Sequence, residues 1–211
     1  MTTRTLSALT AAAAALVLLA GCASATSPGG SIVAGGDPLP TPATTGSVLA
    51  QGTVLQIGDA TPQLCLGVVA ESYPPQCNGP EIAGWDWTAV EMKETAEEVT
   101  WGAFALTGTW DGAIFTSTAE PIPLALFDPA MSAVDPRVDL ANAGAGDEGT
   151  LLRIKDELDA SAGDSMLSTR IENGYVFAQV IFDDGSVQEF VDEEFGADLV
   201  AVQSALTPLG G

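Results

Sequence analysis

Hydrophobic residues along this chain fall into short runs separated by glycine, proline and acidic residues, a pattern typical of β structure. Val54 to Ile57 and Leu64 to Val69 predict two strands, each bounded by such residues. A hairpin is expected where Phe104 to Trp110 runs into Asp111-Gly112, a dipeptide that favours a two-residue type I′ turn, and returns as Ala113 to Thr116. These short strands and glycine-rich bends predict a small, partly closed, OB-like β-barrel.

The period of the hydrophobic positions changes in the second half of the chain. Leu151, Ile154 and Leu158 recur at helical spacing and predict one amphipathic helix over 150–160. Strands are expected after it at 166–171, 175–182, 187–191 and 199–205, with Asn173-Gly174 and Asp184-Gly185 as hairpin turns. The helix can cover one face of this antiparallel meander, so the expected fold class is α+β, mainly β.

A proline-rich stretch over 121–149 interrupts both patterns and predicts a connector. It separates a β domain over 49–120 from the helix and meander over 150–207. About 160 residues suit either two small domains or two halves of one, so both descriptions stay open.

The N-terminal segment has the organisation of an export signal. Arg4 supplies a positive charge, residues 6–20 are largely apolar, and Leu19-Ala20-Gly21-Cys22 forms a lipobox. This pattern resembles that of bacterial membrane lipoproteins, in which the lipobox cysteine takes a diacylglyceryl thioether and becomes the first mature residue. The resemblance implies a signal peptide over 1–21, acylation of Cys22 with chains such as palmitate, and a position at the extracytoplasmic face of the cell membrane.

Two other interpretations of this segment fit its sequence less well. A transmembrane anchor needs ~20 apolar residues, whereas Thr5, Ser7 and Thr10 leave only residues 11–20 uninterrupted. An ordinary cleaved signal peptide explains the length but requires no cysteine after Leu-Ala-Gly. Residues 23–48 are small, polar and rich in Pro and Gly, which predicts that 22–48 is a flexible tether of roughly 30 Å.

The charge balance narrows the choice of partners. The chain has 28 acidic and 6 basic residues, a formal net charge of −22. Binding to a phosphate backbone needs clustered Lys and Arg, so nucleic acid is excluded. Electrostatically steered partners would be cationic or divalent metal ions, although the acids can equally serve to keep an Ala-, Val- and Leu-rich surface soluble.

Histidine is absent, which removes several reaction classes. Ser-His-Asp and Cys-His catalysis and zinc sites with imidazole ligands cannot be built in their usual form. Gly163-Asp164-Ser165 has the look of a lipase block, but without a histidine it is interpreted as a loop entering a strand. No cofactor or metal is expected.

The cysteine count predicts one disulfide. With Cys22 committed to lipid, Cys65 and Cys77 are an even pair in an oxidising compartment, and their bond would be worth ~3 kcal/mol. A reactive or metal-binding pair is disfavoured because the spacing is not Cys-x-x-Cys and no basic residue adjoins.

Aromatic residues form the candidate binding surface. Trp85, Trp87, Trp101 and Trp110 lie within one short window, beside Tyr73 in the disulfide loop. Exposed rings would offer a platform for sugar faces, peptidoglycan-derived fragments or a proline-rich partner. Buried rings would be the core of a small barrel, and this second interpretation is favoured.

Two sets of acidic residues are candidate sites. Asp86 and Asp111, each next to tryptophan, could form a glycosidase pair, but Asp111 is explained by its turn. A calcium site could draw on Asp183, Asp184 and residues 192–194, although the D-x-D-x-D-G loop is missing and solvated turn positions explain these acids.

The blocks ESYPPQCNGP, GWDW, GTWDG and FDDGSVQEFVDEEFG together resemble those of uncharacterised lipoproteins and secreted proteins of high-G+C Gram-positive bacteria. This resemblance implies no activity. The expected role is a lipid-anchored, non-enzymatic binding or scaffolding module of the cell envelope, with a protein or cell-wall partner. The alternatives are an accessory solute- or metal-binding lipoprotein of a transporter and a cell-wall hydrolase using paired carboxylates.

Overall fold

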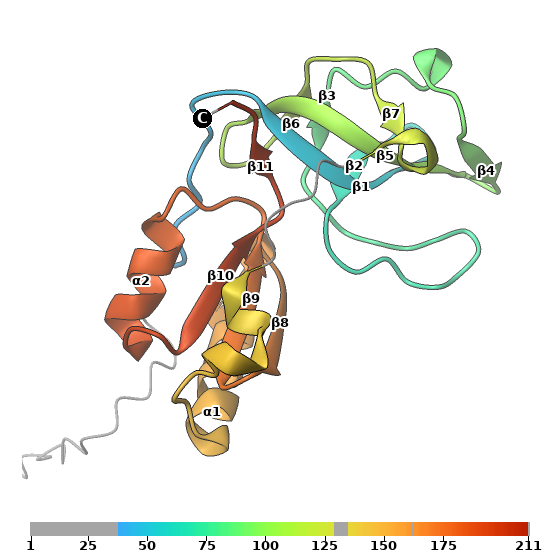
Figure 1. Ribbon diagram of the computed structural model, residues 1–211. Helices are drawn as coiled ribbons and strands as arrows, with labels where there is room; N and C mark the ends of the chain where they lie inside the picture. Colours follow the sequence, from blue (N-terminus) through green and yellow to red (C-terminus); the bar gives the residue numbers. More distant parts are fainter. Residues whose placement is uncertain (1–37, 129–134, 162, 211) are drawn as a thin grey trace, which may run out of the picture. The chain divides into compact units, whose positions relative to one another are not determined.

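Two β-sheets, one of eight strands and one of three, organise the described part of the chain (Figure 1). The structure is a computed structural model and describes residues 38–128, 135–161 and 163–210. The α+β, mainly β class expected from the sequence is confirmed. The expectations for Arg4, the lipobox and Cys22 lie outside the described residues.

Short strands and 3₁₀ turns precede the helices in the chain order. The strands of the larger sheet and the turns between them are β1 (Val48–Ile57), β2 (Gln63–Cys65), β3 (Ile82–Ala83), η1 (Trp87–Ala89), β4 (Glu94–Ala96), β5 (Val99–Trp110), β6 (Phe115–Ser117), β7 (Ile122–Pro123) and η2 (Leu124–Leu126). The elements that follow are η3 (Pro136–Val138), η4 (Leu140–Asn142), α1 (Glu148–Ser161), η5 (Gly163–Ser165), β8 (Met166–Glu172), β9 (Tyr175–Val180), α2 (Ser186–Phe195), β10 (Val200–Ser204) and β11 (Thr207–Pro208).

The larger sheet is built on the antiparallel pairing of β1 with β5. Ten residue pairs join them, from Val48 opposite Gly108 to Ile57 opposite Val99. The main path runs β11-β1-β5-β6-β3, and β2, β4 and β7 pair with β1 or β5 beside it. The sheet curls into half of a barrel, which agrees with the expected partly closed barrel.

The inner face of this sheet shares its core with the second half of the chain. Phe104 and Leu106 on β5 are fully buried there, in one cluster with Ile181, Phe182 and Leu206. Farther along the chain, β11 pairs with β1. The described residues accordingly fall in one compact unit.

Both helices pack on one face of the three-stranded sheet. Leu151, Ile154 and Leu158 of α1 are buried as their spacing predicts, and they join Val187 and Val191 of α2 in one cluster. The strand residues that this cluster covers come from β9 and β10. The opposite face carries a smaller cluster with Tyr175, Phe177, Ala201 and Val138.

The strand expected at 187–191 is wrong, because these residues lie in α2. The carboxylate of Asp183 accepts hydrogen bonds from the backbone N–H groups of Gly185 (2.8 Å) and Val187 (2.9 Å). Asp184 accepts a further one from Ser186. These acceptors satisfy the free N–H groups that begin a helix, so Asp184-Gly185 starts α2 and does not turn a hairpin.

The helix in this position changes the sheet topology from the one expected. It provides a crossover connection, and β10 pairs parallel with β9, from Val200 opposite Val176 to Ser204 opposite Val180. Within the three-stranded sheet, only β8 and β9 pair antiparallel, as the expected meander requires of all its strands. Their Asn173-Gly174 turn is confirmed, with φ of 50° and 80° and Glu172 opposite Tyr175.

The two-residue turn expected at Asp111-Gly112 is wrong in length. Trp110 is opposite Phe115, which leaves a loop of the four residues between them. The carboxylate of Asp111 accepts from the backbone N–H groups of Ala113 (2.9 Å) and Ile114 (2.7 Å). This side chain stabilises a longer turn in the way that Asp commonly does.

Three other boundaries differ from the expectation. Only Gln63–Cys65 is a strand in the apolar run that ends at Val69. The end of the expected tether is packed: Leu39 is buried against the helices, and Thr44 exchanges hydrogen bonds with the backbone of Trp110. The expected connector contains β7, which pairs with β5.

Candidate functional site

The Cys65–Cys77 disulfide is confirmed, and it fixes one end of a long loop. The two Cα atoms lie 5.9 Å apart. Cys65 is buried on β2 and packs with Leu55 and Trp101 on the outer face of the larger sheet. The bond therefore holds the loop between the two cysteines against β1 and β5.

Tyr73, within this loop, contacts Trp101 edge-on. Their ring centroids are 5.4 Å apart, and the ring planes meet at 87°. Tyr73 is 74% exposed, whereas Trp101 is 9% exposed. An edge-to-face pair of this geometry contributes about 0.5–1.5 kcal/mol beyond the area that it buries. The loop thus reaches the sheet through one aromatic contact in addition to the disulfide.

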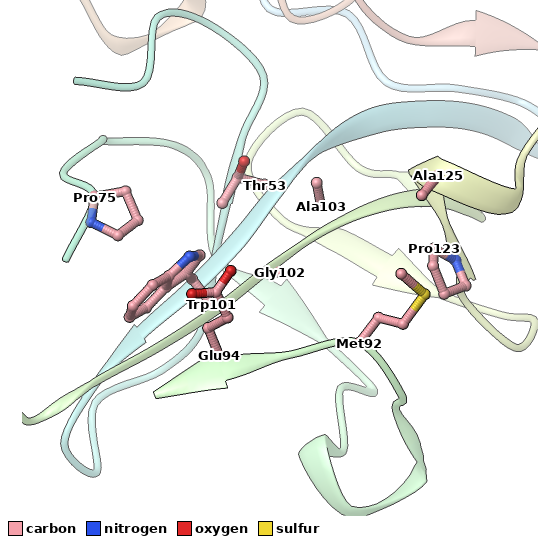
Figure 2. Close-up of a pocket in the computed structure, with 9 residues that line it drawn as sticks. All are labelled: Thr53, Pro75, Met92, Glu94, Trp101, Gly102, Ala103, Pro123 and Ala125. Atoms are coloured by element: carbon pink, nitrogen blue, oxygen red, sulfur yellow. The ribbon is translucent and has the colours of Figure 1, made fainter. Parts of the chain in front are cut away.

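A groove of about 360 Å³ lies on the outer face of the larger sheet, next to this aromatic pair (Figure 2). Trp101 and Pro75 line one end of it, and Met92, Pro123 and Ala125 line the other. The remaining lining residues are Thr53, Glu94, Gly102 and Ala103. We call this set of nine residues the Trp101 groove.

Strand register brings the lining side chains together. Glu94 on β4 is directly opposite Trp101 on β5, and Thr53 on β1 is directly opposite Ala103. Side chains at directly opposed positions of an antiparallel pair lie on the same face of the sheet. A carboxylate, an indole ring and a hydroxyl are thereby collected on one face from three strands.

Gly102 has no side chain, and this leaves space for the Phe104 ring next to the backbone that lines the groove. A Cβ atom at this position would lie 2.6 Å from the Phe104 ring and 3.2 Å from the carbonyl oxygen of Met92. Phe104 is fully buried in the inner core. The absent side chain therefore leaves room for the Phe104 ring and for the backbone of Met92 beside Gly102.

The four tryptophans do not form the single platform that the sequence allowed. Trp101 lies in the groove, and Trp110 is buried in the inner core with 4% of its surface exposed. Trp85 and Trp87 are half-buried, 5.1 Å apart by ring centroids, and pack against Phe104. The favoured interpretation, that the rings fill the inner core, holds for Trp110 and in part for Trp85 and Trp87, whereas Trp101 is buried on the outer face with Leu55 and Cys65.

The carboxylates considered for a hydrolase each serve a local turn. Asp86 accepts from the backbone N–H (2.8 Å) and hydroxyl (2.7 Å) of Thr88, whose side-chain hydrogen bond is the main cause of a lowered Asp86 pKa. The pKa of Asp111 is lowered chiefly by the backbone N–H of Ile114. A general acid needs a raised pKa, so these environments favour the opposite protonation state.

The acids considered for calcium lie at the two ends of α2. Asp183 and Asp184 accept from the first N–H groups of the helix, and Asp192 accepts from the side-chain amide of Gln188 at 2.9 Å. In residues 38–128, 135–161 and 163–210, no group of three His, Cys, Asp or Glu side chains is placed to hold a metal ion.

Ser165 ends η5, immediately before β8. Its backbone carbonyl accepts from the N–H of Ile181 at 3.0 Å. The Gly163-Asp164-Ser165 block leads into a strand as expected, but it forms the 3₁₀ turn η5 and not a loop.

Comparison with models of protein families, with curated proteins and with solved structures gives no match. Among the helices of the described residues, none combines the length and the apolar character that crossing a membrane requires.

Proposed function

We propose that this chain is a lipid-anchored binding or scaffolding module at the extracytoplasmic face of the cell membrane. The observation that carries the proposal is the sequence Leu19-Ala20-Gly21-Cys22 at the end of an apolar segment preceded by Arg4. Two acyl chains on Cys22 would hold the protein at the membrane without a membrane-binding helix. The protein would remain anchored while its folded part stays in the aqueous phase.

The disulfide supports an oxidising location. Cys65 and Cys77 are bonded, and bonds of this kind persist in secreted and envelope proteins and are rare in the cytosol. It joins Cys77, at the end of the loop, to Cys65 on β2. Export through the N-terminal signal would deliver the chain to a compartment in which this bond forms.

The Trp101 groove supports a binding role. A concave site with apolar walls and one or two polar groups is the usual form of a ligand or partner site. Here the walls include Trp101, Pro75 and Met92, and the polar groups are Glu94 and Thr53. We propose that recognition at this groove, and not a covalent reaction, is the role of the folded part.

Metabolic labelling tests the anchor. Cells expressing the full chain are fed an alkyne analogue of palmitate, and label on the purified protein is compared for wild type, Cys22→Ala and Ser24→Ala. The proposal expects label on wild type and Ser24→Ala and none on Cys22→Ala. It also expects Cys22→Ala to lose its retention in the membrane fraction. Equal label on all three proteins would contradict the proposal.

A further inference from the structure

The basic side chains of the described residues are all engaged within the chain. Four of them form ion pairs: Arg137 with Asp135, Arg153 with Glu157, Lys155 with Asp159 and Arg170 with Glu172. The fifth, Lys93, donates from Nζ to the backbone carbonyl of Trp87. Four of the five cations are thus paired with a carboxylate, while Lys93 keeps its charge, so most of the large acidic excess of this part of the chain is not neutralised.

The segment that contributes Met92 and Glu94 to the Trp101 groove carries part of this excess. Glu91, Glu94, Glu97 and Glu98 are all exposed, and Glu94 lines the groove itself. None of the four forms an ion pair with any residue in the described ranges. Lys93 lies among them in the sequence, but its ammonium group is directed to Trp87. The electrostatic potential at the groove thus favours a positively charged occupant.

The walls of the groove suit a long side chain that ends in a cation. Met92, Pro75 and Pro123 offer apolar surface to an alkyl stem. Glu94 lies directly opposite Trp101, so a cation at this end would contact a carboxylate and the π system of an indole together. Lysine and arginine side chains have this combination of stem and head group.

The backbone at Met92 is held in an unfavourable conformation that displays its side chain. Its φ is 57°, in the left-handed region, and its side chain is 58% exposed. A non-glycine residue in this region costs of order 1–2 kcal/mol, so surrounding contacts must maintain it. The exposed thioether lies at the rim of the groove, where an adaptable apolar contact is useful to a docking segment.

The apolar surface extends beyond the groove. Tyr73, which contacts Trp101, is 74% exposed, and Leu126, next to Ala125 in η2, is 71% exposed. One small ammonium ion would leave the exposed surface of both of these side chains uncovered. A stretch of polypeptide has enough length to cover the groove and its flanks together.

We infer that the Trp101 groove docks an extended, lysine- or arginine-rich segment of a partner protein, with one cationic side chain between Glu94 and Trp101. The inference deepens the proposed binding role and rests on it. The labelling experiment on Cys22 tests only the lipid anchor. The anchor and the docking of a cationic segment can therefore be refuted independently.

The test uses the full, oxidised chain in detergent and the probe acetyl-octalysine-amide. Two-dimensional NMR of ¹⁵N-labelled protein reports on the indole N–H signals, and Trp101→Phe assigns the signal of interest by its loss. Binding is also measured calorimetrically for wild type, Glu94→Gln and Glu189→Gln. Glu189 is exposed on α2, so its variant makes the same charge change outside the groove.

The inference expects the peptide to shift the Trp101 signal more than that of the buried Trp110. It also expects Glu94→Gln to weaken binding about 3- to 10-fold and Glu189→Gln by less than about 1.5-fold. Equal weakening by both variants would mean attraction to net charge alone and would overturn the inference. Overturning results are also an unmoved Trp101 signal and equally tight binding of n-butylammonium, which would assign the groove to a small amine.

Discussion

Gln188 on α2 pairs with the backbone of Val202 as a neighbouring strand would. Its Oε1 accepts from the N–H of Val202 at 3.0 Å, and its Nε2 donates to the carbonyl oxygen of Val200 at 3.0 Å. β10 pairs with β9 along its other side. One side-chain amide thus occupies hydrogen-bonding groups on the free edge of the smaller sheet, where strands of other molecules could otherwise pair.

Replacing this amide should destabilise the protein. We expect Gln188→Ala to lower the free energy of unfolding by about 1–2 kcal/mol, because two hydrogen bonds to β10 and one to Asp192 are lost. Chemical denaturation measures the change. Glu189→Ala is the matched control for helix propensity and should change stability by less than about 0.5 kcal/mol. Equal effects would show that the amide contributes nothing particular.

Gly102 should tolerate no side chain. We expect Gly102→Ala to cost about 1–3 kcal/mol, because its methyl group would overlap the Phe104 ring. Gly46→Ala serves as control, since a Cβ there would meet nothing within 4 Å. Gly102→Ala should cost less stability in a Phe104→Leu background than in the wild type, because the ring that its methyl group overlaps is gone. Additive losses in this double-mutant cycle would argue against the overlap.

Removing the disulfide should loosen the loop and lower global stability together. We expect Cys65→Ala with Cys77→Ala to lower the free energy of unfolding by about 3 kcal/mol, from the loop-closure entropy of the unfolded chain. Denaturation of the double variant and of the oxidised wild type gives the difference. The same variant should leave Tyr73 more accessible to iodination, because the loop is no longer fixed at Cys77. Unchanged stability would contradict a structural role for the bond.

Asp135 should contribute to a loss of stability in acid. The side chain of Arg137, which bonds Asp135 at 2.8 and 2.9 Å, is the main reason that the pKa of this carboxyl lies below its usual 3.8. A lowered pKa in the folded state means that the stabilisation is present above about pH 4 and is lost as the pH falls below it. Asp135→Asn should therefore lose less stability between pH 5 and pH 2, in the range of about 1 kcal/mol or below.

Denaturation curves at several pH values measure this dependence. Asp59→Asn removes the same charge at an exposed position and serves as the control. A wild-type-like slope in Asp135→Asn would show that the ion pair has no net effect on stability.

Long periodic segments were predictable from the sequence. Leu151, Ile154 and Leu158 define the buried face of α1 because three apolar residues at helical spacing leave little choice of period. The Asn173-Gly174 turn was also predictable, since both residues adopt positive φ at low cost.

The shorter helix was not recognised, although a signal for it exists. Val187, Phe190 and Val191 recur at spacings of three and four, which fits a helix better than alternation does. The window is short and follows an Asp-Gly dipeptide that also favours hairpins. The carboxylate of Asp183 favours the helix over the hairpin, because it accepts hydrogen bonds from the backbone N–H groups of Gly185 and Val187. These contacts depend on three-dimensional positions.

The Trp101 groove could be predicted only in part. Trp101 and Tyr73 were candidates, but Glu94 and Met92 were not, because their positions depend on the register of β4 against β5. The turn that sets this register is Glu97-Glu98, which contains neither Gly nor Asn. Glu97 nevertheless adopts a φ of 54°, a left-handed conformation that is not expected for glutamate from the sequence.

The pairing of β11 with β1 has a consequence for how the chain matures. Leu206 and the two residues of β11 complete the core and edge of a sheet whose other strands all lie before residue 124. During synthesis from the N-terminus, this sheet cannot be completed until both helices and β8 to β10 have also been made. Folding of the larger sheet therefore depends on the last residues of the chain. A chain stalled before Leu206 would expose the apolar core of this sheet.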